Sequence, residues 1–427
     1  MKYFIFSLVT LFTGVANAQT AQNPWDWTVY ARYRFEDASQ YDLVNTKQFS
    51  SIRIRPTINY TGIDRLKVVI EPQFNKVMGG EAFTPSSTTA NSTTETSGNT
   101  AYNGSLDSMT FRSAYLDVSM NENFNLLVGR QALSYGDQYI IGPADWGIYG
   151  RTFDAARLKF KNDSFQVDGF QAKIVETVST ANNNGGDKDL YGLYGTYSRS
   201  GFIKTADLYG FYLQDNQSRT AVPADDTRPW HFGTYGGRLV SEEGPWSWKA
   251  EIAKNFGTEN TAAMGRDDQN AMVDARVNYQ FSGSRPQKLG LQIYQAGENW
   301  RELYPTPYEP FGRTDLLGRR NIMGAALHLS SVWSEKWQTE VSGYYFQRTN
   351  TDTMAFQPDG KTAVGNLNSN SSYVGTEIDL VAKYAMTQNL TLSGSYNYFF
   401  VGDYLKESVG GENKSPSYLY LMLEAKY

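Results

Sequence analysis

Residues 52–60 read Ile-Arg-Ile-Arg-Pro-Thr-Ile-Asn-Tyr, a segment in which apolar and polar side chains alternate at every position. Successive side chains of a β-strand point to opposite faces, so this strand would carry aliphatic groups on one face and arginines on the other. A soluble protein would bury the apolar face against a second layer. In a membrane barrel that face contacts lipid and the polar face lines an aqueous lumen. The alternation therefore predicts a β-protein and leaves both settings open.

The same alternation recurs along the chain, and no segment between the N-terminal region and the C-terminus has a helical period. About eighteen runs can be counted, with sixteen or twenty remaining as alternatives. They start near residues 27, 48, 65, 109, 123, 151, 164, 188, 204, 231, 246, 270, 287, 321, 337, 373, 389 and 417. The runs at 109, 123 and 188 alternate poorly.

Short and long connections alternate between these runs. Thr61–Asp64, Asn162–Asp163 and Ala385–Gln388 are typical short turns. The long polar segments include 77–108, 134–150, 298–320 and 349–372, and the Ser/Thr/Asn-rich stretch 81–108 is predicted to be a mobile external loop. A barrel with both termini in the periplasm has tight turns on that side and long loops outside, whereas a soluble sandwich has no reason to sort its loops in this way.

Aromatic residues flank the short turns, where they would form a belt at the interface between lipid headgroups and hydrocarbon. They are Tyr60, Phe124, Phe160, Phe165, Tyr197, Phe202, Trp246, Phe281, Trp337 and Tyr384. The chain also ends in an alternating strand that closes with Tyr427, a form that the barrel-assembly machinery of outer membranes recognises. These features together predict an all-β fold: a transmembrane antiparallel up-and-down β-barrel of about 18 strands, with short periplasmic turns and long extracellular loops.

The N-terminus predicts export. Lys2 precedes an apolar run from Tyr3 to Val15 and the small-residue site Ala16-Asn17-Ala18, so residues 1–18 are expected to be a signal peptide and residues 19–427 the barrel. The chain has no Cys, which excludes disulfides and thiol chemistry, and no cofactor is expected. With 39 Lys and Arg against 44 Asp and Glu it is not a basic nucleic-acid binder.

Strand parity assigns many charged side chains to the lumen, where they would set ion preference. The first six runs are rich in cations, and later runs are mixed or acidic. The predicted lumen residues are Arg32, Arg34, Arg53, Arg55, Lys67, Arg151, Arg157, Lys159, Lys249, Arg276, Glu377 and Asp379. The one-sided arginine excess favours a path for anions, because a guanidinium binds both oxygens of a carboxylate. The alternative is that these charges only pair with their neighbours on the wall.

Signals for catalysis are weak. His328 shares parity with lumen-facing positions, but no nucleophile motif accompanies it. Glu377 and Asp379 lie two apart on one strand face, a spacing compatible with glycoside chemistry and also common by chance. In the loop 300–321, the aromatic residues Trp300, Tyr304, Tyr308 and Phe311 would either stack on sugars or pack the loop over the mouth, and the sequence favours neither. The chain is therefore predicted not to be an enzyme.

Several segments resemble the alginate-export family of outer-membrane barrels. They are Gly129-Arg130-Gln131 with Tyr135-Gly136-Asp137, Arg151-Thr152-Phe153-Asp154-Ala155, Leu303-Tyr304-Pro305-Thr306 and Gly375-Thr376-Glu377-Ile378-Asp379, with Tyr396 to Tyr404. The resemblance implies an eighteen-stranded barrel whose arginine-lined lumen lets an anionic uronate polymer leave the periplasm. It would add Arg130 to that lining, a position that strand parity leaves undecided. The exporters' long periplasmic plug before the penultimate strand is not expected, since Ala385–Gln388 is short.

The expected function is passage or export of an anionic, uronate-type polysaccharide across the outer membrane of a Gram-negative bacterium. The alternative is a general or anion-preferring porin for small hydrophilic solutes. Expected partners are outer-membrane lipid, the assembly machinery and periplasmic polysaccharide-export components, with no nucleic acid and no metal.

Overall fold

A computed structural model of the chain describes residues 23–78, 108–175, 187–199, 201–215, 230–257, 270–283, 285–308, 311–408 and 415–427. The proposed signal peptide and the low-complexity segment 81–107 lie outside these residues, and both remain predictions. Within the described part no helix is long and apolar enough to cross a bilayer.

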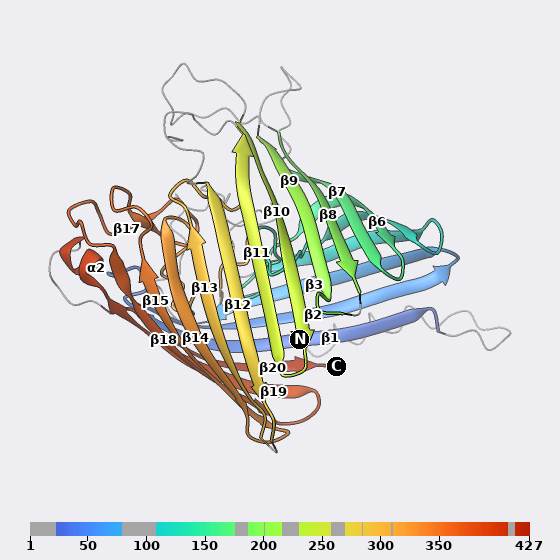
Figure 1. Cartoon of the computed structure of the whole chain (residues 1–427). Coiled ribbons are helices and arrows are strands. Elements are labelled where there is room, and N and C mark those ends of the chain that lie inside the picture. The colour runs from blue at the N-terminus through green and yellow to red at the C-terminus, as the bar shows by residue number, and fades with distance from the viewer. Residues whose placement is uncertain are drawn as a thin grey trace.

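Eighteen antiparallel strands form one closed sheet (Figure 1). The main strands are β1 (Trp25–Ser39), β2 (Lys47–Ile63), β3 (Leu66–Met78), β4 (Ser108–Ser119), β5 (Phe124–Gln131), β6 (Phe153–Lys161), β7 (Phe165–Val175), β8 (Lys188–Ser198), β9 (Thr205–Asp215), β10 (Trp230–Glu243), β11 (Trp246–Gly257), β12 (Ala271–Phe281), β13 (Gln287–Ala296), β14 (Ile322–Val332), β15 (Trp337–Gln347), β18 (Tyr373–Ala385), β19 (Leu390–Val401) and β20 (Ser417–Lys426). Each pairs with its neighbour in sequence, and β1 pairs with β20 to close the barrel. The predicted strand count is confirmed, and every strand starts within two residues of its predicted position.

Two short elements were not predicted, and both lie in long connections. The ribbon β16 (Ala355–Phe356) and β17 (Ala363–Val364) folds between β15 and β18, and helix α2 (Asp403–Ser408) follows β19. Each is too short to leave a periodic signal in the sequence. Both lie on the left of Figure 1, where long connections gather.

The outward face of the barrel is apolar and ends in aromatic pairs at the short turns. Ring centroids of neighbouring strands are 4.5 Å apart for Trp25 and Tyr60 and 4.6 Å apart for Trp337 and Tyr384. Phe124 and Phe160 form another such pair at 4.9 Å. Amphipathic and aromatic rings at one level form the girdle expected at a membrane interface.

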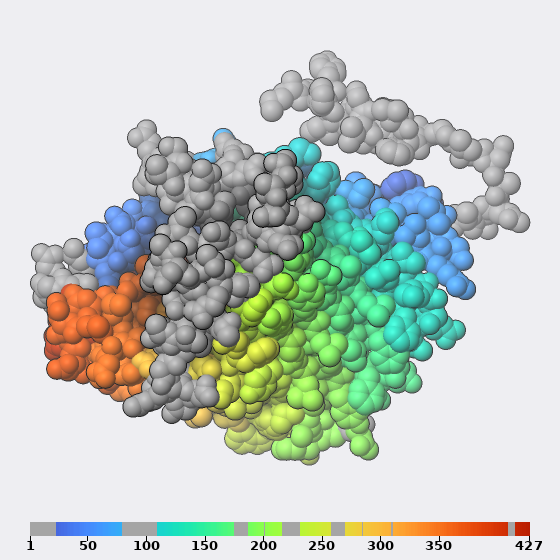
Figure 2. Space-filling view, turned by 90° about the horizontal axis from the view of Figure 1, so that it is seen from above, coloured from blue at the N-terminus to red at the C-terminus, as the bar shows by residue number. Residues whose placement is uncertain are grey.

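Viewed from above, the strand colours pass round the molecule from teal through green and yellow to orange (Figure 2). The barrel interior is a packed space. Buried aromatic and aliphatic side chains from inward strand positions and from connections between strands form one cluster. Three of these connections supply Tyr135, Trp300 and Ala355, respectively. We call these connections the first inner loop (residues 132–152), the second inner loop (297–321) and the third inner loop (348–372).

Candidate functional site in the barrel lumen

Five arginines on inward positions of β1, β2 and β4 form what we call the arginine wall. They are Arg32, Arg34, Arg53, Arg55 and Arg112. Arg32 and Arg53 face one another directly in the β1–β2 register. Like charges in such a pair repel each other, and all five residues are no more than 7% exposed, so the wall requires acceptors close by.

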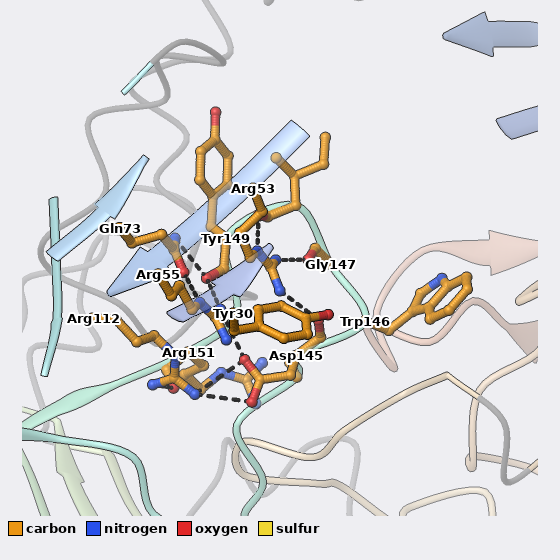
Figure 3. A network of polar contacts seen from close by, with 12 residues as sticks. Tyr30, Arg53, Arg55, Gln73, Arg112, Asp145, Trp146, Gly147, Tyr149 and Arg151 are labelled. Carbon is orange, nitrogen blue, oxygen red and sulfur yellow. Dashed lines mark hydrogen bonds and ion pairs between the residues drawn. The ribbon is translucent and has the colours of Figure 1, made fainter. Parts of the chain in front are cut away.

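The first inner loop supplies those acceptors through its backbone carbonyls (Figure 3). Arg53 donates from Nε to the carbonyl of Ile148 at 2.9 Å and from Nη1 to that of Asp145 at 2.9 Å. Further bonds to the carbonyls of residues 145–149 come from Arg32, Arg34 and Arg55, and from Gln73 on β3. The arginine wall therefore holds the first inner loop against the barrel, because buried guanidinium groups need all of these bonds.

Asp145 is the one carboxylate at the centre of this contact. Its Oδ1 accepts from Arg55 at 3.0 Å and its two oxygens accept from Arg112 at 3.1 Å. Burial by itself would raise the pKa of Asp145, but the guanidinium groups of Arg112, Arg55 and Arg53 outweigh it and hold the pKa below its usual value. Asp145 thus stays ionised at neutral pH and neutralises part of the wall.

This lowered pKa predicts an acid-sensitive loop. The stabilising contribution of ionised Asp145 is present above its unfolded pKa, about 4, and is lost as the pH falls through the lowered folded value. Single-channel conductance should therefore be constant from pH 7 to about pH 4 and rise below that. The variant Asp145→Asn should be more conductive at pH 7 and lack the acid step. A native channel whose conductance does not change in acid would contradict this role.

The second inner loop runs beside the first and is hydrogen-bonded to its backbone. Ile141 and Tyr304 form an isolated bridge, and the backbone N of Thr306 donates to the carbonyl of Gln138 at 2.9 Å. Arg151 joins the two loops, because its Nη1 donates to the carbonyl of Pro305 at 2.7 Å. Burial lowers the pKa of Arg151 to about 10, and the group is still charged at neutral pH.

The third inner loop is fastened to the second. Asn321 Nδ2 donates to the carbonyls of Asn350 at 2.9 Å and Thr353 at 2.8 Å, and the backbone N of Gly318 donates to Phe356 at 2.8 Å. The three loops therefore form one connected assembly inside the barrel.

The loop aromatics serve packing within this assembly. Trp300 is completely buried, and Tyr304, Tyr308 and Phe311 are nearly so. Tyr308 stacks on Trp146 of the first inner loop with centroids 3.9 Å apart. Of the two roles that the sequence left open, the structure supports packing of the loops.

Glu377 on β18 holds the second inner loop from a second part of the wall, three strands from β1. Its carboxylate accepts from the backbone N of Arg313 at 2.6 Å, and from Thr314 N at 2.8 Å and Oγ1 at 2.6 Å. Gly312 makes this approach possible, because it has φ +88° and any Cβ there would lie 2.5 Å from the carboxylate of Glu377. Asp379 lies one step along the same strand face and is 1% exposed.

Replacing Glu377 by alanine should release the second inner loop. The variant loses three charge-assisted hydrogen bonds, each contributing on the order of 1.5–3 kcal/mol. Trypsin should then cut the folded barrel after Arg313, Arg319 or Arg320, which are buried or half-buried in the native protein. The matched control Glu424→Ala removes an inward carboxylate on β20 that accepts from Tyr30 on the neighbouring strand β1, and it should stay resistant. Equal resistance of Glu377→Ala and the native chain would show that this contact is dispensable.

The other predicted lumen residues lie on the wall as parity indicated. Arg157 pairs with Asp168, Lys249 contacts Asp137 of the first inner loop at 2.6 Å, and Arg276 donates to Asn278 at 3.0 Å. Lys67 and Lys159 are half-buried, and Lys159 lines a cavity of about 430 Å³ near the short turns. Whether any of them contacts a solute remains a prediction.

Arg130 is the exception, and its placement in the lumen was wrong. It lies two positions from Val128 and therefore on the same, outward face of β5, and it pairs across strands with Asp154. Both Arg130–Asp154 contacts are 2.7 Å. The family motif was matched correctly, but parity on the short strand β5 places this side chain outside the barrel.

Sequence reasoning missed Arg112 and Asp145. Arg112 was not predicted because the pairing of β3 with β4 shifts its register by a β-bulge between Glu71 and Pro72, and simple alternation fails there. Asp145 lies in a loop, and no periodic pattern indicates which way a loop side chain points.

A cavity of about 610 Å³ remains beside the loop assembly, and we call it the loop cavity. Its walls come from the second inner loop, the tip of the third inner loop and inward positions of β8–β10. The cations that line it are Arg151, Lys188, Arg301, Arg319, Arg320 and Lys361, and the acids are Asp215, Glu302 and Asp359. Cations thus outnumber acids two to one. Arg319 is ion-paired with Glu302, and Lys188 with Asp215, so part of this charge is compensated.

His328 lies in the lumen as predicted, with Nδ1 2.9 Å from Ser342 Oγ and Nε2 3.1 Å from Gln292 Oε1. A serine hydrolase instead pairs the histidine with serine on one nitrogen and a carboxylate on the other. Here an amide occupies the second position, so the contact resembles structural hydrogen bonding on the wall.

A closed eighteen-stranded barrel with an apolar outer face, a charged lumen and inward-folded loops defines an outer-membrane channel. The chain belongs to the alginate export family, whose profile matches residues 26–416. That family and this fold indicate a channel and not an enzyme, located in the outer membrane. Among curated proteins no sequence matches this chain.

Solved structures with the same fold include three channels of low sequence identity. Acinetobacter baumannii OccAB1 has a TM-score of 0.62 at 10% identity, covering 94% of this chain and 96% of that one. Pseudomonas aeruginosa OccD3 has a TM-score of 0.56 at 11% identity, with coverages of 94% and 91%. Pseudomonas aeruginosa OpdK, solved with vanillate, has a TM-score of 0.57 at 9% identity, with coverages of 94% and 98%.

Proposed function

We propose that this protein is a passive channel for small acidic solutes, up to the size of a short uronate oligosaccharide. The observation that carries the proposal is the loop assembly. Three loops cross-linked by hydrogen bonds and anchored to the wall at β1–β4 and at β18 occupy the lumen, and a cavity of about 610 Å³ lies beside them. Cavities of roughly 300–1,000 Å³ suit small ligands.

The charge of the loop cavity supports the acidic character of the solute. Six cations against three acids leave an excess of positive charge, and low-dielectric walls concentrate the field of such groups on a passing ion. The arginine wall contributes less, because the first inner loop covers it. The vanillate that accompanies OpdK is a carboxylate, which agrees with this solute class for the fold.

Export of a long anionic polysaccharide is the second candidate, and the family match favours it. A polymer would need the loop assembly to move aside, with periplasmic export components as partners. Single-channel recording separates the two functions. Uronate monomers and dimers should cause brief, concentration-dependent blockades and a permeant current, and long polyuronate should not enter. Threading of long polymer through the native channel from the periplasmic side would overturn the small-solute proposal.

We also propose that β20 is the strand that the assembly machinery recognises. It closes the barrel against β1, and Tyr427, which follows it directly, is exposed. Deleting Tyr427 should reduce the amount of folded barrel in the membrane several-fold without changing the conductance of the channels that do fold. Unchanged assembly would contradict this role.

A further inference from the structure

The loop cavity has an apolar part as well as a charged part. Leu213 on β9 and Leu303 in the second inner loop both line it, and both side chains are only partly buried where they pack against the cluster of the barrel interior. Pro307 and Pro358 line the same cavity and are half-buried. A solute in the loop cavity therefore contacts apolar side chains in addition to cations.

The acids that line the loop cavity already accept bonds from the protein. Asp215 pairs with Lys188 at 3.0 Å, and Glu302 pairs with Arg319. Asp359 accepts from two backbone N–H groups of its own turn, each at 2.8 Å. A hydroxyl group of a bound solute would have to compete with these donors for the same carboxylate oxygens.

Backbone acceptors of the lining are engaged in the same way. The carbonyl of Pro305 accepts from Arg151 at 2.7 Å, and that of Gly360 accepts from Arg320 at 2.7 Å. The prolines of the lining add no backbone donor, because proline has no N–H group. Among the described lining residues, the polar groups that face a solute are thus mainly the N–H donors of arginine and lysine.

These donors suit a carboxylate. Lys361 at the tip of the third inner loop is exposed, and Arg301 and Arg320 of the second inner loop are half-buried. An ionised carboxylate only accepts hydrogen bonds, and its bonds from charged donors are the stronger kind. It therefore binds in this lining without needing an acceptor in return.

We propose that the loop cavity prefers a carboxylate with an apolar body to a hydroxylated sugar acid of the same size. This inference rests on the proposed function, because it requires acidic solutes to pass through the loop cavity. Each hydroxyl of a sugar acid is a donor that loses its water in the cavity, and an unmade hydrogen bond costs free energy. An apolar ring of the same size instead gains from contact with Leu213 and Leu303.

The aromatic rings of the lining do not offset this loss for a sugar. Trp300 is completely buried, and Tyr304 and Phe232 are no more than 7% exposed, so their ring faces pack against the protein. A sugar ring cannot stack on a face that the protein covers. The accessible apolar contacts are aliphatic, so the preference concerns the apolar character of the solute and does not require an aromatic ring.

Cyclohexanecarboxylate and glucuronate form a matched pair of probes. Each has one carboxylate on a six-membered ring, and only glucuronate carries hydroxyl groups. Single-channel recording at neutral pH gives the Kd of each from the concentration dependence of its blockades. Cyclohexanecarboxylate should bind on the order of tenfold more tightly and block for correspondingly longer, because its ring leaves water for an apolar contact. The neutral analogue cyclohexylmethanol should bind more weakly than either acid.

Polar replacement of the two leucines locates the preference. In the double variant Leu213→Asn, Leu303→Asn the Kd of cyclohexanecarboxylate should rise on the order of tenfold relative to that of glucuronate, so that the ratio approaches one. The matched control Leu213→Met, Leu303→Met keeps the volume and apolar character of both side chains and should keep the preference. Heat-modifiable gel mobility reports folding. Leu303 lies in a loop, so Leu303→Asn alone provides the comparison where the double variant does not fold.

Equal Kd values for the two acids in the native channel, or a lower value for glucuronate, would overturn the inference and leave the proposed function intact, because acids would still block. A preference that persists in the asparagine variant would also overturn it, since it would then not arise at the leucines. Equal blockade by cyclohexylmethanol and cyclohexanecarboxylate would do so too, because the cations would contribute nothing. Absence of blockade by both acids would overturn the proposed function together with the inference.

Discussion

Replacing Arg53 and Arg55 together by alanine should increase single-channel conductance on the order of threefold, because the free cross-section of the lumen limits passage. The two side chains donate to the carbonyls of residues 145–149 and to the carboxylate of Asp145. Hydrogen bonds from charged groups contribute roughly 1.5–3 kcal/mol each. Loss of several of them therefore removes much of the free energy that holds the first inner loop on the wall. Without them the first inner loop should leave the wall.

The expected current also has a characteristic form. A loop that detaches and returns should produce frequent steps between two levels, whereas the native channel should stay at one level. The matched control is Arg276→Ala, which removes an inward arginine that donates to Asn278 on its own strand. It should leave both conductance and noise close to native. Native-like current from the Arg53→Ala, Arg55→Ala channel would show that the loop is held by its contacts with the second inner loop alone.

The second large effect concerns ion preference. Changing Arg301 and Lys361 to glutamate in the loop cavity alters its charge by four units. At about 10 Å each unit contributes roughly 0.4 kcal/mol in water and about 1.7 kcal/mol at an effective dielectric of 20. The sum is enough to lower the anion-to-cation permeability ratio on the order of tenfold at low salt.

Reversal potentials in a salt gradient measure this ratio directly. The effect should shrink in 1 M salt, where the screening length falls to about 3 Å. Lys204→Glu, on an exposed turn at the other end of the barrel, changes charge outside the lumen and serves as control. A reversal potential unchanged in Arg301→Glu, Lys361→Glu would remove the loop cavity from the permeation path and leave the charge of the solute undecided.

Much of the architecture follows from local properties of the chain. Alternation at residues 52–60 and in similar runs predicted strands, because the period of side-chain direction is fixed by backbone geometry. The sorting of connections by length predicted the barrel and its closure. Aromatics such as Phe124 and Trp337 marked the turn end, since the interface selects such side chains wherever a strand leaves the bilayer.

Local sequence did not predict the side-chain directions beside β-bulges or the partners of loop residues. Arg112 faces the lumen because it is the extra residue of a β-bulge in the pairing of β4 with β3. Arg130 faces outward because its strand β5 takes its side-chain parity from the pairing with β4. The contacts of Asp145 with Arg55 and of Arg151 with Pro305 join residues 90 and 154 positions apart in sequence. Such contacts depend on where whole loops fold, and local sequence does not encode that.

The sequence by itself determined the strand count, the two-faced wall and the positions of most inward charges, because each depends on a period of two residues and on transfer from water to lipid. Only the tertiary structure decided what those charges do. The arginines predicted to face a solute instead donate hydrogen bonds to the carbonyls of residues 145–149. A buried guanidinium binds the nearest acceptors, and here the inward-folded first inner loop supplies those acceptors.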